Sequence, residues 1–154
     1  LRMRGPNIMR GYLGLQAESS NAFDDRGFFR TGDMAQIDEQ GFLTITGRIK
    51  EMMIVGGENV FPREIEEVLN AHPSVHDSGV IGLQDPMRGE VPIAFVEAAE
   101  DTTPDPDELI RWCREKLPGY KVPRRVVLIE ALPRNGTGKI MRRMLRPELE
   151  HLGA

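Results

Sequence analysis

The chain has 154 residues, of which 40% are hydrophobic and 29% are charged, and its formal net charge at pH 7 is -4. A chain of this size can form one ordinary hydrophobic core, or a small domain together with a piece of another. The negative charge excludes a general nucleic-acid binder, because such proteins need a dominant basic field.

Residues 1–50 are predicted to form strands and turns. Their apolar residues stand in short runs, separated by turn sequences such as Asp-Arg-Gly and Thr-Gly-Asp. Residues 34–48 predict a hairpin that closes at Asp38–Gly41. The chain has no initiator Met, and its first four residues already alternate like a strand. We therefore expect it to be a fragment of a longer protein.

A second hairpin and a helix are predicted next. The apolar run of residues 51–60 is interrupted by Gly56 and Gly57, which indicates a tight hairpin or a loop. Residues 61–72 predict a helix, because Pro62 suits its first position and acidic residues follow near its positive end. One face of this helix is apolar and is formed by Ile65, Val68 and Leu69.

Three strands are predicted in the rest of the chain, at residues 75–85, 90–98 and 124–130. Alternate residues of the second strand are apolar and form one face: Val91, Ile93 and Phe95.

Two more helices are predicted between and after these strands. The first spans residues 105–117, where Asp105 caps the helix and Glu108 completes a capping box. The second is basic and runs from Lys139 to about Glu150. From Lys50 onward, the order of elements predicts a small α+β domain, with a roughly three-stranded sheet flanked by helices and a β-hairpin.

The sequence "PRNGTGKIMRR" places Lys139 behind a Gly-Thr-Gly turn. It does not fit a P-loop, because Pro133 stands where the first glycine is needed and Ile140 replaces the hydroxyl residue. A lysine at a helix N-terminus can still meet an anion. A glycine-rich turn before a surface helix is the alternative interpretation.

Other candidate residues also leave two interpretations open. Asp33 could accept hydrogen bonds from the hydroxyls of a ribose, or be an ordinary turn residue. Arg48 could contact a phosphate or ribose, or form a surface salt bridge. Lys50 could be a hinge or a solvated linker residue. Gly56 and Gly57 could let the backbone approach a ligand, or simply form the hairpin turn.

The sequence carries no sign of a metal site. Cys113 is the one cysteine, so an internal disulfide framework is excluded, and no CxxC or Cys/His cluster suggests zinc. His72 and His76 are separated by Pro73 and do not share a helical face. No long apolar run and no signal peptide is visible. We expect a cytoplasmic protein without a transmembrane segment or a nucleic-acid partner.

Three segments, in this order and at these separations, resemble the adenylate-forming superfamily: residues 4–14, residues 27–69 with "RTGD", "GRIK" and "GGENVFPREIEEVL", and residues 133–146. This superfamily comprises acyl-CoA synthetases, aryl-CoA ligases, firefly luciferase and peptide-synthetase adenylation domains. The resemblance implies that residues 1–49 are the β-rich end of a large N-terminal AMP-binding domain. It also implies that residues 50–154 are the mobile C-terminal domain.

The resemblance also implies a role for each candidate residue. Asp33 corresponds to the acid that binds the ribose hydroxyls, and Arg48 to an arginine that contacts the nucleotide. Lys139 corresponds to the catalytic lysine, which contacts the substrate carboxylate and the α-phosphate. Lys50 corresponds to the hinge residue. After rotation about the hinge, a second group of residues would line the pantetheine tunnel: Gly56, Gly57 and Glu58.

The function that this resemblance implies is ATP-dependent acyl-CoA synthesis. The enzyme would adenylate a carboxylic acid, expected to be a fatty acid, and pass the acyl group to CoA. ATP, CoA and Mg²⁺ would take part, with Mg²⁺ bound mainly by the missing N-terminal domain, and the isolated chain would be inactive. Two alternatives remain: an enzyme that loads a carrier-protein pantetheine, and a non-catalytic interaction module.

Overall fold

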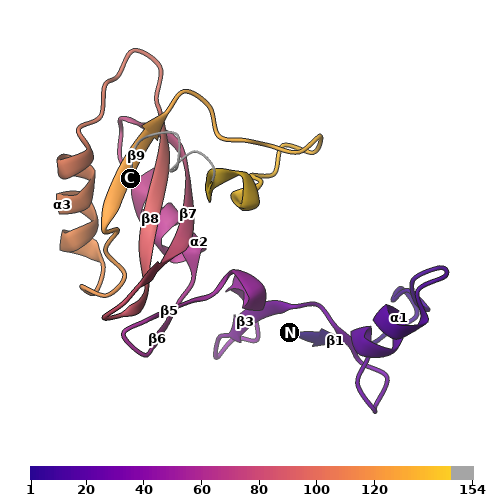
Figure 1. Cartoon of the computed structure of the whole chain (residues 1–154). Helices are drawn as coiled ribbons and strands as arrows, with labels where there is room; N and C mark the ends of the chain where they lie inside the picture. Colours follow the sequence, from indigo (N-terminus) through magenta and orange to yellow (C-terminus); the bar gives the residue numbers. More distant parts are fainter. Residues whose placement is uncertain (147–154) are drawn as a thin grey trace. The chain divides into compact units, whose positions relative to one another are not determined.

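The computed structural model describes residues 1–146 and divides the chain into two compact units, Leu1–Lys50 and Glu51–Ala154 (Figure 1). Each unit has its own hydrogen-bonded sheets.

The first unit contains two small antiparallel sheets and a short helix. Strands β1 (Arg2–Met3) and β2 (Phe29–Arg30) pair with each other, as do β3 (Asp33–Ile37) and β4 (Leu43–Arg48). The predicted hairpin at residues 34–48 is therefore confirmed. Its turn is closed by the Asp38 N–H, which donates to the Phe42 carbonyl at 3.0 Å.

Helix α1 (Gln16–Ala22) was not predicted, so the expectation of strands and turns alone is wrong there. The helix buries no residue and has no side-chain cap at its N-terminus, so it lacks both of the usual sequence signals. Within it, the Ser19 and Ser20 hydroxyls donate to backbone carbonyls one turn earlier. A single-turn 3₁₀ helix, η1 (Ile49–Glu51), follows β4.

The second unit is built on a five-stranded sheet. Its longest strands, β7 (Val75–Asp85) and β8 (Gly89–Ala98), are antiparallel, and β9 (Arg125–Ile129) runs parallel to β8. These are the three predicted strands. The predicted second hairpin is also present, as β5 (Met53–Val55) and β6 (Glu58–Val60). It joins the sheet where Val55 pairs with Gly89.

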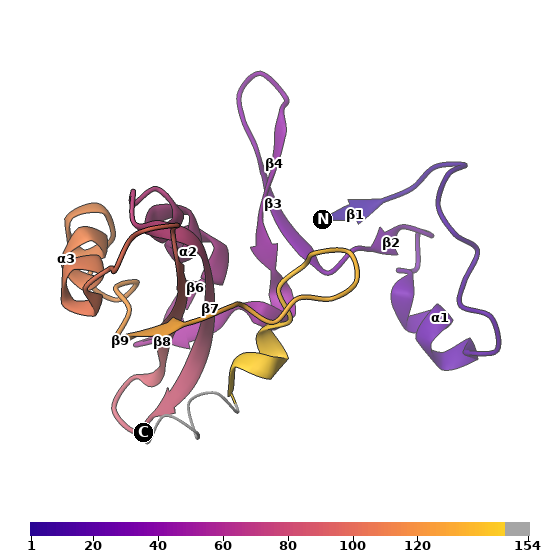
Figure 2. The same ribbon diagram turned by 90° about the horizontal axis from the view of Figure 1, so that it is seen from above.

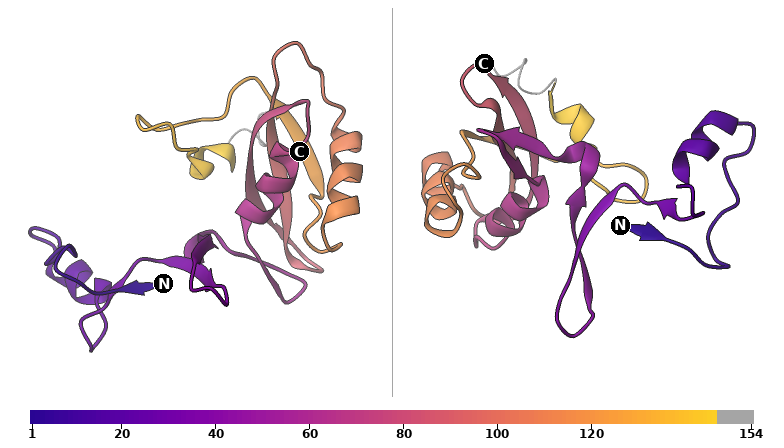
Figure 3. Two further views of the ribbon diagram at one scale, coloured as in Figure 1. Left: turned by 180° about the vertical axis from the view of Figure 1, so that it is seen from behind. Right: turned by 90° about the horizontal axis from the view of Figure 1, so that it is seen from below.

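Side chains of the sheet alternate between two apolar layers, as expected for strands that are covered on both faces. Helices α2 (Pro62–Asn70) and α3 (Pro106–Lys116) cover one face, and the segment after β9 packs on the other (Figures 2 and 3). The helix-covered layer contains Val80, Ala94, Val96 and Val126, with Ile65, Leu69, Leu109 and Cys113 from the helices. The opposite layer contains Ile81, Val91, Ile93, Phe95 and Val127, with Leu132 and Leu145.

The second unit corrects two details of the prediction. Asp105 caps α3 by accepting the Asp107 N–H at 3.0 Å, but the Glu108 carboxylate lies 3.8 Å from His72 Nε2 instead of forming a capping box. The predicted basic helix does not begin at Lys139, which lies in a loop. Helical structure first occurs in the 3₁₀ helix η2 (Arg142–Met144), and residues 147–150 of the predicted helix lie outside the described part.

Candidate functional site

Asp33 and Arg48 face each other in the first unit. Asp33 begins β3, Arg48 ends β4, and the two are Cα partners in the antiparallel register. Arg48 Nε donates to Asp33 Oδ1 at 2.8 Å, and the two side chains are 40% and 19% exposed. The backbone N–H of Asp33 donates to Thr31 Oγ1 at 3.0 Å, which fixes the start of the strand. A carboxylate and a guanidinium are thus presented together at the open end of the β3–β4 hairpin, opposite its turn.

This pair retains capacity for a ligand. Within residues 1–146, no hydrogen bond is made to Asp33 Oδ2 or by the Nη atoms of Arg48. A carboxylate accepts and a guanidinium only donates, so the two groups could together bind a hydroxyl-bearing and phosphorylated ligand. The salt bridge that the alternative interpretation of Arg48 required is also present, with Asp33 as its partner.

Gly56 and Gly57 form the two-residue turn between β5 and β6. Their φ angles are +60° and +89°, and Val55 pairs with Glu58 directly beyond them. A two-residue hairpin turn with positive φ at both positions is the geometry that glycine adopts most easily. The turn therefore explains the glycine pair without a ligand. A Cβ at either glycine would meet nothing within 4 Å, and Glu58 beside them is exposed, so there is space around the tip of the hairpin.

The loop that carries Lys139 is organised by the side chain of Asn135. Its Oδ1 accepts the Thr137 N–H at 3.1 Å, the Thr137 hydroxyl at 2.8 Å and the Lys139 N–H at 2.9 Å. The Asn135 N–H donates to the Lys139 carbonyl at 2.9 Å, and Gly138 takes a φ of +81°. Asn135 was not among the candidate residues, although Asn before Gly is a known turn signal.

The Lys139 side chain is exposed. It makes no ion pair or hydrogen bond with any other residue between 1 and 146. Its neighbour Ile140 pairs with Arg134 in an isolated antiparallel bridge and packs against the apolar layer opposite the helices. The ammonium group thus projects from a closed loop with an anchored base.

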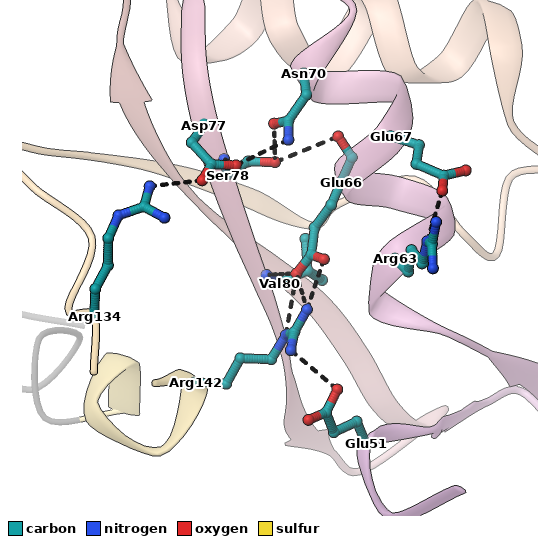
Figure 4. Close-up of polar contacts among 10 residues, drawn as sticks. All are labelled: Glu51, Arg63, Glu66, Glu67, Asn70, Asp77, Ser78, Val80, Arg134 and Arg142. Carbon is teal, nitrogen blue, oxygen red and sulfur yellow. Dashed lines mark hydrogen bonds and ion pairs between the residues drawn. The ribbon is translucent and has the colours of Figure 1, made fainter. Parts of the chain in front are cut away.

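An ion pair of Arg134 anchors the segment that leads into this loop (Figure 4). Arg134 Nη2 donates to Asp77 Oδ2 on β7 at 2.6 Å. Partial burial raises the pKa of Asp77, but the hydrogen bonds from Arg134, the Ser78 N–H and the Asn70 amide outweigh this effect and hold the pKa below its usual value. The segment that leads out of the loop is anchored by Arg142, which pairs with Glu66 and Glu51.

The two histidines that were considered as metal ligands have separate partners. His72 Nδ1 lies 2.8 Å from the Ser74 hydroxyl, and His76 Nε2 lies 3.8 Å from a Glu97 carboxylate oxygen. Across residues 1–146, no three His, Cys, Asp or Glu side chains are grouped so that they could hold a metal ion. In the same part of the chain, no helix is long and apolar enough to cross a membrane.

Comparison with known proteins places these elements in one family. Residues 64–139 match the family model of the AMP-binding enzyme C-terminal domain. The 2-succinylbenzoate–CoA ligase of Bacillus mycoides is 43% identical over 150 residues, which cover 97% of this chain and 31% of the relative. The chain thus spans about 30% of the length of the curated relatives that it matches.

Solved structures agree with this match. The ATP-bound MatB of Rhodopseudomonas palustris has a TM-score of 0.90 and 35% identity, over 99% of this chain and 30% of that protein. The o-succinylbenzoate CoA synthetase of Bacillus subtilis, in complex with the acyl-adenylate OSB-AMP, has a TM-score of 0.84 and 36% identity. The latter match covers 93% of this chain and 29% of that protein. The chain therefore belongs to the adenylate-forming superfamily and carries the C-terminal domain of its AMP-binding enzymes.

Proposed function

We propose that this chain is the C-terminal part of an ATP-dependent acid–thiol ligase. The ligase would join a carboxylic acid to AMP and then transfer the acyl group to CoA. The observation that carries this proposal is the match of nearly the whole chain to 2-succinylbenzoate–CoA ligase. The candidate residues present chemical groups that suit both steps.

We assign the two units to the two domains of such a ligase. The unit Leu1–Lys50 would be the end of the large N-terminal domain, and the unit Glu51–Ala154 the small C-terminal domain. Lys50 would be the hinge. This assignment is supported by its place as the last residue of the first unit, exposed and within the single turn of η1. A hinge needs few residues that absorb the change in backbone angles, and this site has little packing to lose.

Asp33 and Arg48 would bind the nucleotide. The Asp33 carboxylate can accept hydrogen bonds from the two ribose hydroxyls, while Arg48 donates to a phosphate or to the ribose. Their ion pair supports this role, because Arg48 holds the carboxylate in one orientation before the ligand arrives.

Lys139 would act in the first step. In that step a carboxylate oxygen attacks the α-phosphorus of ATP, the bond to the departing pyrophosphate breaks, and acyl-AMP forms. Two anions must meet, so an ammonium between them lowers the cost of the crowded negative charge. The exposed ammonium of Lys139, on a loop closed by Asn135, supports this assignment. The Mg²⁺ that accompanies ATP would be held mainly outside this chain.

The second step needs a different group near the acyl-AMP. The CoA thiol attacks the acyl carbon, loses its proton, and AMP leaves. We propose that rotation about Lys50 withdraws Lys139 and presents Gly56, Gly57 and Glu58 to the pantetheine arm. The hairpin tip supports the proposal, because a Cβ at either glycine would meet nothing within 4 Å, which leaves space beside this backbone for a ligand.

The acid that the ligase would use is proposed from the names of the relatives. A fatty acid was expected from the sequence, but the curated relatives described above are named for 2-succinylbenzoate. We therefore propose a carboxylic acid as the substrate class, with 2-succinylbenzoate as the first compound to test. Loading of a carrier-protein pantetheine is not favoured, because these relatives are named as CoA ligases.

The test uses the protein that contains this chain, incubated with ATP, Mg²⁺, CoA and a mixture of aromatic and fatty acids. Mass spectrometry follows AMP and new thioesters. An acyl-CoA product would support the ligase and identify its acid. Acyl-AMP without a CoA thioester would favour a carrier-protein acceptor, and the absence of any product would favour the non-catalytic module.

A further inference from the structure

Arg142 joins three separate segments of the second unit. It lies three residues after Lys139, at the start of η2. Its Nε and Nη2 donate to Glu66 Oε1 at 3.1 and 2.9 Å, and Nη2 also reaches Glu66 Oε2 at 2.7 Å. Its Nη1 donates to Glu51 Oε2 at 3.0 Å (Figure 4). All three guanidinium nitrogens thus donate, Nε and Nη2 to Glu66 and Nη1 to Glu51.

Glu66 is an unusual residue for a core helix. It is one of the few buried charged residues, and its side chain is only 10% exposed. Besides Arg142, it accepts the backbone N–H of Val80 on β7 at 2.8 Å. One carboxylate thereby ties α2 to β7 and to the segment that follows the Lys139 loop.

A buried ion pair of this kind needs a reason other than stability. Removing two charges from water costs nearly as much as their attraction returns, so apolar side chains of similar volume often stabilise a fold equally well. The pair instead fixes an orientation, because the planar guanidinium donates to its partners in one geometry. Here the pair fixes the position of the segment that follows Lys139 and begins η2.

Two further contacts hold the base of the Lys139 loop. Arg134 is paired with Asp77, and the Met141 N–H donates to the Pro133 carbonyl at 2.7 Å. The segment before the loop tip is therefore attached to β7 through Arg134, and the segment after it is attached to α2 and η1 through Arg142. Only the tip around Lys139 projects beyond these attachments.

We propose that Arg142 is a positioning residue for Lys139, holding the loop as a fixed extension of the small domain through Glu66 and Glu51. The inference rests on the proposed function of Lys139. Glu51 directly follows Lys50, so the Arg142–Glu51 bond links the loop to the segment beside the proposed hinge. Lys139 is then delivered by motion of the whole domain and not by motion of the loop alone.

Such a device suits the chemistry of the first step. A catalytic group displaced by about 1 Å can lose on the order of 10²-fold in rate, and a lysine at the tip of a loose loop would sample many positions. Fixing the base of the loop removes that freedom before ATP and the acid arrive.

The test compares Arg142→Ala and Arg142→Lys with the matched control Arg143→Ala in the full-length protein. Arg143 is exposed and makes no hydrogen bond or ion pair with residues 1–146. Hydrogen exchange over residues 134–141 is read by mass spectrometry. The rate of acyl-AMP formation is measured separately from that of thioester formation from supplied acyl-AMP.

We expect Arg142→Ala to speed exchange in the loop and to lower kcat for acyl-AMP formation by ~10²-fold, with thioester formation near wild type. Arg142→Lys should lie between, because it keeps the charge and loses the fork. Arg143→Ala should match wild type in both measurements.

Two results would overturn the inference. One is unchanged exchange of residues 134–141 in Arg142→Ala. The other is an equal loss in both half-reactions, as expected if Arg142 supports only the fold. The exchange measurement does not depend on activity. A wild-type protein that forms no acyl-AMP would therefore contradict the proposed function, while the exchange data would still decide whether Arg142 fixes the loop.

Discussion

Arg134 and Asp77 lie 57 residues apart in the sequence and form a 2.6 Å ion pair that attaches the Lys139 loop to strand β7. The pair is only partly exposed, with the two side chains at 34% and 24%. Because Asp77 also accepts bonds from Asn70 and from the Ser78 N–H, it connects the loop to α2 as well.

This ion pair predicts a pH dependence of stability. The folded-state pKa of Asp77 is lowered, so its contribution is present above the ordinary value of 3.8 and is lost as the pH falls through the lower folded value. For a partly exposed pair, we expect about 1 kcal/mol or less. The free energy of unfolding, measured by urea denaturation, should differ between wild type and Asp77→Asn at pH 6 and converge toward pH 2. A difference that stays constant with pH would contradict this prediction.

A larger side chain at Gly79 should clash with the segment after β9. A Cβ at this position of β7 would lie 3.0 Å from Leu145 Cδ1 and 3.4 Å from both Ile140 Cγ2 and Leu132 Cδ2. We expect Gly79→Val to lower the free energy of unfolding by about 1–3 kcal/mol, as overpacking does. Gly119→Ala is the control, because nothing lies within 4 Å of a Cβ there. Equal stability of the two variants would show that this layer has room.

Substitution of Asn135 should disturb the Lys139 loop and leave the rest of the fold intact. Asn135→Ala removes the one acceptor of three hydrogen bonds, whereas Asn135→Asp keeps it. Because the loop tip is exposed, the melting temperature should change little. If Lys139 is catalytic, acyl-AMP formation should fall by about 10- to 100-fold in Asn135→Ala and much less in Asn135→Asp. Full activity of Asn135→Ala would mean that the loop conformation does not matter for the reaction.

The thiol of Cys113 should react slowly with thiol reagents in the folded protein. Burial of Cys113 on the inner face of α3 raises the pKa of its thiol to about 11, although the charge of Lys116 opposes the shift. The reactive thiolate is therefore scarce at pH 8, and the sulfur is also inaccessible. Labelling by a disulfide reagent should be slow in the native protein and immediate in denaturant. Rapid labelling without denaturant would show that α3 opens easily.

Much of the fold of the second unit could be predicted from the sequence, because its signals are local. The alternation of Val91, Ile93 and Phe95 predicted one face of β8, and all three lie in one apolar layer. The helical spacing of Ile65 and Leu69 likewise predicted the buried face of α2. In each case a short window of sequence carries the periodicity.

The basic helix predicted from Lys139 was wrong at its start because a pairing outside that segment decides the conformation. Ile140 pairs with Arg134 and enters the apolar layer, so the chain is extended where a helix was expected. The Arg142–Glu66 pair, whose partners lie 76 residues apart in the sequence, has no local signal at all. Asp33 and Arg48 were each chosen separately, and only the register of the hairpin brings them together.

The central claim is that Lys139 serves the adenylation step, and one measurement tests it most directly. Single-turnover rates of acyl-AMP formation, and of thioester formation from supplied acyl-AMP, are compared for wild type, Lys139→Ala and the control Lys116→Ala on α3. The account predicts that Lys139→Ala lowers the first rate by roughly 10²–10³-fold and leaves the second near wild type, with Lys116→Ala normal in both. Equal losses in both half-reactions of Lys139→Ala would contradict it.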